Sequence, residues 1–297
     1  MKTETNKKAD IAIIGGSGLE HIEGMHVIET IDIDTPFGKP SDSITIAKFS
    51  GRRVAFLPRH GRGHSIPPTF VPYRANIWAL KSIGVFWIVT FSAVGSLNID
   101  MAPEHFCIPD QVIDRTRHRQ DSFFDEIVVH ASFADPFNAQ LRRILVDVCR
   151  TEGVKTHDGG TYVCMEGPQF STRAESNLYR SWHADLIGMT ALPEAKLALE
   201  AEMAYATVAQ ITDYDCWHDS VVTVDEVLRR MKNNVANVHR VISRLIPMIP
   251  VGQENENPAS SALKYALTTN PACIGADLRD KYGLLLGKYV DFEGHLR

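Results

Sequence analysis

The sequence has no long hydrophobic run, no excess of basic residues and no closely spaced pair of cysteines. No segment approaches the ~20 apolar residues that a membrane span requires, and the polar amino terminus "MKTETNKKAD" lacks the apolar stretch of a secretory signal. The formal net charge of -5 argues against nucleic acid as a partner. The five cysteines are scattered, which favours reduced thiols over disulfides or a metal cluster. We therefore expect a soluble, cytoplasmic protein without membrane or nucleic-acid partners.

What the 297 residues do contain is an alternation of strand and helix patterns. Short apolar runs such as "IAIIGGSG" (residues 11–18) and "VFWIVTFS" (residues 85–92) predict buried strands. Apolar and polar residues alternate on both sides of Ser50-Gly51, which predicts a hairpin. Helically spaced apolar residues and two capping boxes predict helices over 136–152, after Thr172, over 193–205 and after Thr223. This order predicts an α/β fold, a single-domain sandwich of three layers with a central mixed sheet flanked by helices.

The composition changes after Pro250, where "VGQENENPASS" is polar and rich in turn-forming residues. We expect one domain over residues 1–250 and a C-terminal extension over residues 251–297, with one helix near 276–289. The extension is too short to fold alone, so we expect it to pack on the domain or on a neighbouring subunit.

Four loops beside predicted strands carry groups suited to binding an anion, because glycines allow close approach while amides, hydroxyls and arginine donate hydrogen bonds. The groups are Ser17 in "GGSG", Arg59 and His60 in "PRHGRGH", Ser92 and Ala93 in "SAVGS", and Thr190 in "GMT". Each has a structural alternative, namely a strand-ending turn, a solvated basic loop or a helix cap. The strict dinucleotide and P-loop fingerprints are absent.

Two carboxylates, Asp213 and Asp215, end the apolar run "ATVAQITDYD". Residues i and i+2 of an extended segment face the same side, so we expect both to reach one ligand. Close carboxylates raise the pKa of one of the pair, which makes a general acid available near neutral pH. The alternatives are a helix cap or a metal pair. A metal is disfavoured because no third ligand stands at a suitable spacing, although His218 and Asp219 lie nearby.

Taken in order, several motifs resemble the trimeric nucleoside phosphorylases, in particular the branch that cleaves 5′-deoxy-5′-methylthioadenosine. The motifs are "GGSGL", "PRHGRGH", "YRANIWALKSIG", "SAVGSL", "EGPQFSTRAES", "GMT", "PEAKLALEAEMAYA" and "TDYDCW". The resemblance runs from about Ile11 to Ile249. It implies a homotrimer with sites at subunit interfaces, leaves a dimer of trimers open, and implies a place in purine and methionine salvage.

The resemblance also implies the reaction and the role of each site residue. Inorganic phosphate, a co-substrate, attacks C1′ and releases adenine and 5-methylthioribose 1-phosphate, without a metal or an organic cofactor. The phosphate-binding residues would be Ser17, Arg59, His60, Ser92, Ala93 and Thr190. Asp213 would protonate N7 of the purine and Asp215 would accept from its amino group. Met189 and Phe170 would line the ribose and base, Ser171 would affect selectivity, Val224 and Val227 would form the methylthio pocket, and His130 would enter from the adjacent subunit.

Three alternatives stay open at this point. The preferred nucleoside could be 5′-deoxyadenosine, adenosine or a 6-oxopurine nucleoside. The chain could instead be a hydrolase, which releases the base without phosphate. It could also be a non-catalytic purine-binding protein, which releases no base at all.

Overall fold

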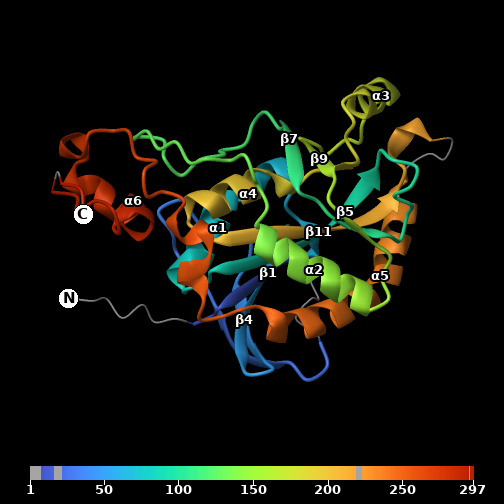
Figure 1. Ribbon diagram of the computed structural model, residues 1–297, viewed down its shortest axis with the longest axis horizontal. Coiled ribbons are helices and arrows are strands. Elements are labelled where there is room, and N and C mark those ends of the chain that lie inside the picture. The colour runs from blue at the N-terminus through green and yellow to red at the C-terminus, as the bar shows by residue number, and fades with distance from the viewer. Residues whose placement is uncertain (1–7, 17–21, 219–222, 294) are drawn as a thin grey trace.

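The computed structural model describes residues 8–16, 22–218, 223–293 and 295–297, which form an eleven-stranded sheet between helices (Figure 1). The strands are β1 Ile11–Gly15, β2 His26–Ile31, β3 Ile44–Phe49, β4 Arg52–Pro58, β5 Trp87–Ser96, β6 Phe106–Ile108, β7 Gln111–Arg115, β8 Thr156–Asp158, β9 Thr161–Met165, β10 Leu186–Gly188 and β11 Ala204–Asp213. The α-helices are α1 Tyr73–Ser82, α2 Ala139–Thr151, α3 Arg173–Ser181, α4 Ala191–Glu200, α5 Val224–Met248 and α6 Arg279–Leu286.

The sheet is mixed, and its centre is parallel. One path of paired strands runs β2-β3-β4-β1-β5-β10-β9-β7, while β11 pairs with β5 and β6, and β6 pairs with β8. Strands β4, β1, β5 and β11 are parallel to their neighbours at the centre, whereas β10 runs antiparallel to β5. The predicted α/β fold with a central mixed sheet is confirmed.

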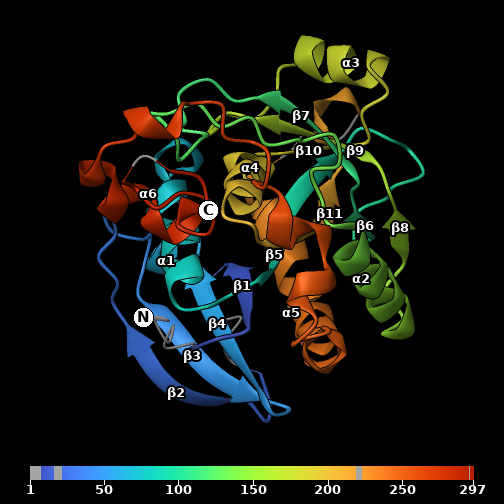
Figure 2. The same ribbon diagram turned by 60° about the vertical axis from the view of Figure 1, so that its left-hand side comes forward.

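Alternate residues of the central strands face two separate cores. In β1, Ile11 and Ile13 pack with α2 and α5, whereas Ala12 and Ile14 pack with α1 and α4. This alternation follows from the period of two residues in a strand. Figure 2 shows the two helix pairs on opposite faces of the sheet. A sheet buried on both faces explains why β1 reads as a continuous apolar run.

Local signals in the sequence place several elements correctly. Ser50 and Gly51 both have positive φ, 47° and 78°, as a tight hairpin turn between β3 and β4 requires. The Thr172–Glu175 capping box begins α3 as predicted. The helix predicted over 193–205 was wrong at its end, because α4 stops at Glu200 and β11 begins at Ala204. Short apolar runs do not distinguish helix from strand by periodicity.

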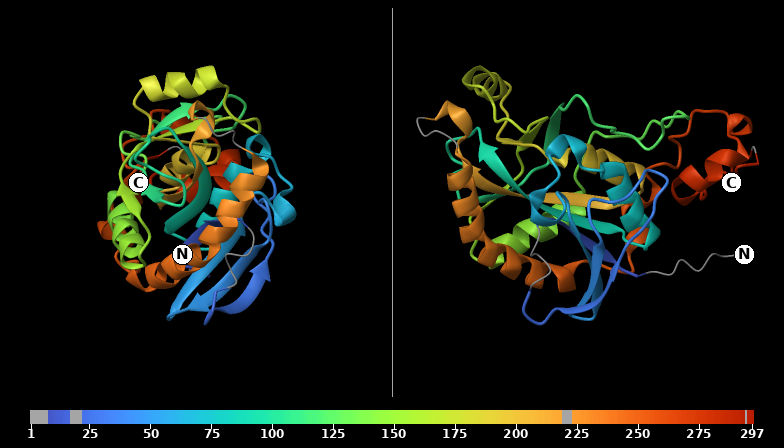
Figure 3. Two further views of the ribbon diagram at one scale, coloured as in Figure 1. Left: turned by 90° about the vertical axis from the view of Figure 1, so that its right-hand side faces the viewer. Right: turned by 180° about the vertical axis from the view of Figure 1, so that it is seen from behind.

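The chain after Pro250 packs against the body of the molecule. Leu263, Tyr282 and Leu286 are buried in the core that also contains α1 and α4. The backbone near Val128 pairs with the same segment, since the Thr268 amide donates to the Val128 carbonyl at 3.0 Å. Figure 3 shows α6 at the end of the molecule remote from α3. No helix among the described residues is long and apolar enough to cross a membrane.

Replacing Gly188 at the end of β10 tests the packing of the sheet. A Cβ atom there would lie 2.7 Å from Tyr162 Cζ and closer still to the Tyr162 hydroxyl oxygen. We expect Gly188→Ala to lower the free energy of unfolding by ~1–3 kcal/mol, measured by urea denaturation, because the core must shift to admit the methyl group. Adding Tyr162→Phe should recover part of this loss; an unchanged urea midpoint in Gly188→Ala would contradict the packing described.

Candidate active site

Strand β5 leaves a short stretch of one edge without a partner strand. Strand β11 pairs with Trp87 through Gly95, so β1 and β10 must share the opposite edge of β5. On that edge β1 pairs with β5 only as far as Thr90, and the pairing of β10 with β5 covers only Gly95 and Ser96. Residues 91–94 lie between them. In α/β proteins, ligands bind at such points, where neighbouring strands diverge at their carboxyl ends.

Three chain segments converge on this open stretch. β1 ends at Gly15, and the Arg59 amide, just after β4, donates to the Gly15 carbonyl at 3.0 Å. Met189 follows the last residue of β10. The structure therefore brings together three of the four predicted anion-binding segments, those with Arg59, Ser92 and Thr190. Ser17, predicted for the fourth, lies outside the described residues.

Arg59 is held in a buried ion pair that sequence patterns did not reveal. Its Nε and Nη2 donate to the two carboxylate oxygens of Glu194 at 2.8 and 3.0 Å, and its Nη1 donates to the Phe91 carbonyl at 3.3 Å. Arg59 is 2% exposed and Glu194 0%. Burial disfavours the charged guanidinium, but Glu194 outweighs this effect and holds the pKa of Arg59 above its usual range.

This arrangement leaves Arg59 with hydrogen-bonding capacity. A guanidinium has five N–H groups, and the three bonds named above use one each. One N–H of Nη1 and one of Nη2 remain for a ligand beside Phe91. The Tyr205 hydroxyl also donates to Glu194, at 3.0 Å, and so fixes the carboxylate that fixes Arg59.

His60 is neutral and has a defined tautomer. Burial, together with the positive charge of Arg59, lowers the pKa of His60 to about 4. Its Nδ1 lies 2.8 Å from the Ile66 carbonyl oxygen, which can only accept, so the proton is on Nδ1. The Nε2 atom therefore carries the lone pair. The ring also stacks on His64, with centroids 4.2 Å apart.

Asp213 and Asp215 lie together, but the extended geometry expected for them was wrong. β11 ends at Asp213, and Asp215 has a left-handed φ of 50°. The Asp215 amide turns back and donates to Asp213 Oδ1 at 2.8 Å. Both side chains nevertheless face Gly95: a Cβ on that glycine would lie 2.9 Å from Asp213 Oδ1 and 3.4 Å from Asp215 Cβ. Gly95 is therefore needed for the approach of the acids.

Both carboxyl groups favour the protonated state more than exposed aspartates do. Burial raises the pKa of Asp213, although hydrogen bonds from Thr212 Oγ1 and the Asp215 amide support its charged form. Burial likewise raises the pKa of Asp215, which is 4% exposed. The Ser176 hydroxyl is close enough to favour the carboxylate of Asp215 but is not in hydrogen-bond geometry, since Ser176 Oγ and Asp215 Oδ2 both lack partners among the described residues.

The other predicted site residues lie in varied surroundings. Thr190 is buried and precedes α4 without capping it through its side chain. The Met189 carbonyl is already bound, because it accepts from Arg119 Nη1 at 2.6 Å. Phe170, His130 and Val224 are exposed, whereas Ser171 and Val227 are half-buried. Ser92 and Ala93 are half-buried in the open stretch of β5.

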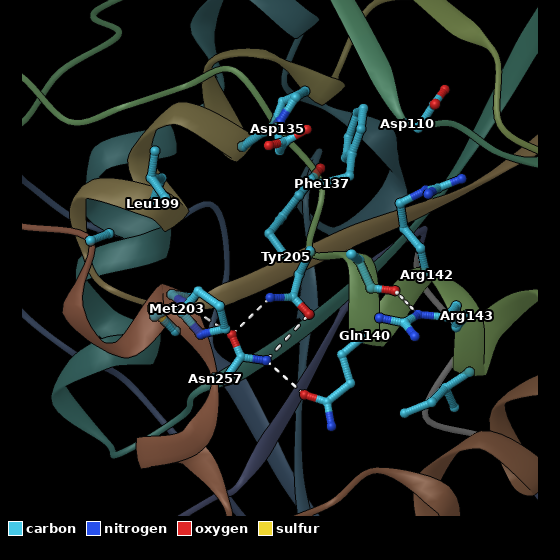
Figure 4. A pocket seen from close by; sticks show the side chains of 18 of the residues that line it. Asp110, Asp135, Phe137, Gln140, Arg142, Arg143, Leu199, Met203, Tyr205 and Asn257 are labelled. Atoms are coloured by element: carbon cyan, nitrogen blue, oxygen red, sulfur yellow. Dashed lines mark hydrogen bonds between the residues drawn. The ribbon is translucent and has the colours of Figure 1, made fainter.

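A cavity of about 980 Å³ lies between α2, α4 and the segment after Pro250, and Tyr205 is among the residues that line it. Figure 4 shows Asn257 at its wall beside Gln140, to which the Asn257 side chain donates at 2.9 Å. Asn257 also accepts from the Asn138 side chain at 2.8 Å. None of the predicted site residues that the structure describes lines this cavity. Among the described residues, no three His, Cys, Asp or Glu side chains form a group that could hold a metal ion.

The sequence of the chain is similar to those of known phosphorylases. Residues 10–247 match the phosphorylase superfamily. The S-methyl-5′-thioadenosine phosphorylase of Synechocystis sp. is 49% identical over 294 residues, which cover 97% of this chain and 90% of the relative. The enzyme of the same name from Geobacter sulfurreducens is 48% identical over 284 residues, which cover 94% of this chain and 99% of the relative.

Solved structures that resemble this chain are also named methylthioadenosine phosphorylases. A methylthioadenosine phosphorylase from an antarctic soil metagenomic library has a TM-score of 0.90 at 45% identity, covering 94% of this chain and 99% of the other. Methylthioadenosine phosphorylase from Schistosoma mansoni in complex with adenine has a TM-score of 0.83 at 32% identity, covering 88% and 99%.

Removing one partner of the buried ion pair tests how Arg59 is held. Glu194→Leu leaves the Arg59 charge buried without a counter-ion, so we expect the free energy of unfolding to fall by ~3–5 kcal/mol in chemical denaturation. The double variant Arg59→Met/Glu194→Leu removes both charges and should lose less than the single variant. Equal losses in the two proteins would show that the charges do not interact as described.

Proposed function

The chain belongs to the phosphorylase superfamily, and we propose that it cleaves 5′-deoxy-5′-methylthioadenosine with inorganic phosphate to give adenine and 5-methylthioribose 1-phosphate. The observation that carries this proposal is the placing of two chemistries at two points along β5, one at the open stretch and one just after it. Arg59 contacts Phe91, and the acid pair faces Gly95. Four residues of strand span roughly 13 Å, which suits a nucleoside with phosphate beneath its sugar at one end and acids at its base at the other.

Phosphate binds at the Arg59 end. The two remaining N–H groups of Arg59 meet its ionised oxygens, and Ser92, the Ala93 amide, Thr190 and Ser17 complete the set of donors. As the bond from C1′ to N9 breaks, the sugar becomes oxocarbenium-like, and the anion held beneath C1′ stabilises that charge. A phosphate oxygen then bonds to C1′.

His60 recognises a protonated oxygen of phosphate. Its Nδ1 hydrogen is committed to the Ile66 carbonyl, so Nε2 can only accept. The O–H of monohydrogen phosphate supplies the matching donor. This contact turns the ionised oxygens towards Arg59 and C1′.

The acid pair works at the base. The electron pair of the broken bond enters the purine, and Asp213 donates a proton to N7, so that neutral adenine leaves; such proton transfer contributes roughly 10²–10⁴-fold. Asp215 accepts from the exocyclic amino group. A 6-oxopurine would turn an oxygen towards that carboxylate and be disfavoured by repulsion and by the lost hydrogen bond.

The remaining roles concern the 5′ end and the assembly. Val224 and Val227 offer apolar surface to the methylthio group, and Phe170, Met189 and Ser171 border the ribose and base. His130 is exposed on a segment that also exposes Val128, which supports a homotrimer in which His130 enters the neighbouring site. We place the enzyme in the cytoplasm, with residues 1–250 as the catalytic domain, residues 251–297 as an extension, and no cofactor.

A substrate panel with and without phosphate tests the reaction and the base preference together. We expect adenine release from the methylthio compound to be fast and to depend on phosphate, and release from inosine to be slow. Release without phosphate would indicate a hydrolase, and no release in either case a binding protein. Faster cleavage of inosine would contradict the role of Asp215.

Two substitutions separate the ends of the site. Asp213→Asn should lower kcat far more than it weakens phosphate binding, whereas Arg59→Ala should mainly raise the KM for phosphate. Because burial raises the pKa of Asp213, wild-type kcat should be highest below that pKa and fall about tenfold per pH unit above it. The Asn variant should lose this dependence. Full turnover and phosphate affinity in both variants would rule out the assigned site.

A further inference from the structure

Arg119 is a buried cation that is not one of the predicted site residues but binds the loops that carry them. Its side chain is 1% exposed, although it comes from the irregular segment between β7 and α2. It contacts three separate segments: the end of β9, the start of α4, and Tyr73 at the start of α1. Sequence patterns gave no sign of this residue, because its partners are 46 to 73 positions away.

The first set of contacts holds the loop that contains Thr190. Arg119 Nη1 donates to the carbonyls of Met189 and Leu192, both at 2.6 Å. These two carbonyls bracket Thr190. The backbone on both sides of Thr190 is therefore held by the guanidinium.

The second set holds the loop that leads to Phe170. Arg119 Nη2 donates to the carbonyls of Glu166 at 2.7 Å and Met165 at 3.3 Å, and Arg119 Nε donates to Glu166 Oε1 at 3.2 Å. The same Glu166 carboxylate accepts from Thr69 Oγ1 at 2.6 Å and from the Arg117 amide at 2.5 Å. Although burial opposes it, these bonds lower the pKa of Glu166 to about 2. The pair is therefore ionised at neutral pH.

The third contact reaches the loop that orients His60. Tyr73 Oη lies 3.2 Å from Arg119 Nη1 and shares the two hydrogens of that nitrogen with the Met189 and Leu192 carbonyls. Tyr73 Oη in turn donates to the Pro68 carbonyl at 3.1 Å. Pro68 lies two residues after Ile66, whose carbonyl holds the His60 ring. Together with Thr69, this joins the 66–70 loop to the same guanidinium.

We propose that Arg119 is a positioning residue, which holds the loops of Thr190, Phe170 and His60 at fixed separations without touching the substrate. The inference rests on the proposed function. A planar guanidinium can bond carbonyls on two sides and a carboxylate at once, which the point charge of lysine cannot do. Because a misplacement of ~1 Å at a site costs about 10²-fold in rate, the fork of Arg119 sets catalytic efficiency.

The test compares Arg119→Ala and Arg119→Lys with a matched control. Arg142 also binds two carbonyls and a carboxylate, those of Ile108, Pro109 and Asp158, but it joins α2, β6 and β8, which carry none of the proposed site residues. We expect Arg119→Ala to lower kcat/KM for phosphate about 10²-fold, and millimolar guanidinium to restore about tenfold of this. Arg119→Lys should stay about tenfold below wild type. Arg142→Ala should lose thermal stability but keep wild-type kcat and KM.

Wild-type kinetics in Arg119→Ala, with only a lower Tm, would overturn the proposal in favour of a purely structural role. If Arg119→Ala does not fold, Arg119→Lys decides: a wild-type KM for phosphate overturns the proposal, and a raised KM supports it. Hydrogen exchange at amides 189–192 provides a readout independent of the reaction. Exchange should be faster in Arg119→Ala than in Arg142→Ala. That result would stand even if the wild-type protein released no adenine, in which case only the proposed function would fail.

Discussion

The site depends on one constraint, which is that β5 has three partner strands and only two edges. Because β11 occupies one edge along its length, β1 and β10 divide the other, and they leave residues 91–94 between them. The residues between them keep backbone groups that no strand satisfies. Loops from both sides arrive at this place because the strands that they follow end there. The open stretch is thus a consequence of sheet topology rather than of any single motif.

Two buried arginines supply positive charge beside this stretch. Arg59 is paired with Glu194, and both are buried; Arg119 is also buried, but its partner Glu166 is 17% exposed. A carboxylate partner allows each arginine to be buried. The N–H groups of the arginine that the carboxylate does not use can donate to neighbouring segments or to a ligand. The two positive charges also add to burial in keeping His60 neutral. An anion site built in this way binds through a few oriented donors rather than through a basic surface, which agrees with the net charge of -5.

Much of the fold was predictable because its signals are local. Capping at Thr172, the hairpin at Ser50-Gly51 and the apolar runs of the central strands depend on residues a few positions apart, and these predictions were correct. The acids at the end of β11 were also visible as a pattern. Their geometry was not, since the turn after Asp213 arises from a bond between its own carboxylate and the Asp215 amide. The extended interpretation assumed a strand that continued two residues too far.

Residue types, their order and the periodicity of burial were determined by the sequence alone, and with them the α/β class and the chemistry available to the site. Only the tertiary structure decided which charges face each other. Glu194 and Arg119 have no local pattern, because their partners lie 135 and 47 positions away and meet them only when the sheet is assembled. The physical reason is the free-energy cost of burying a charge, which is acceptable only when a counter-ion lies beside it. Because that counter-ion comes from a distant part of the chain, a local sequence pattern does not reveal the pair.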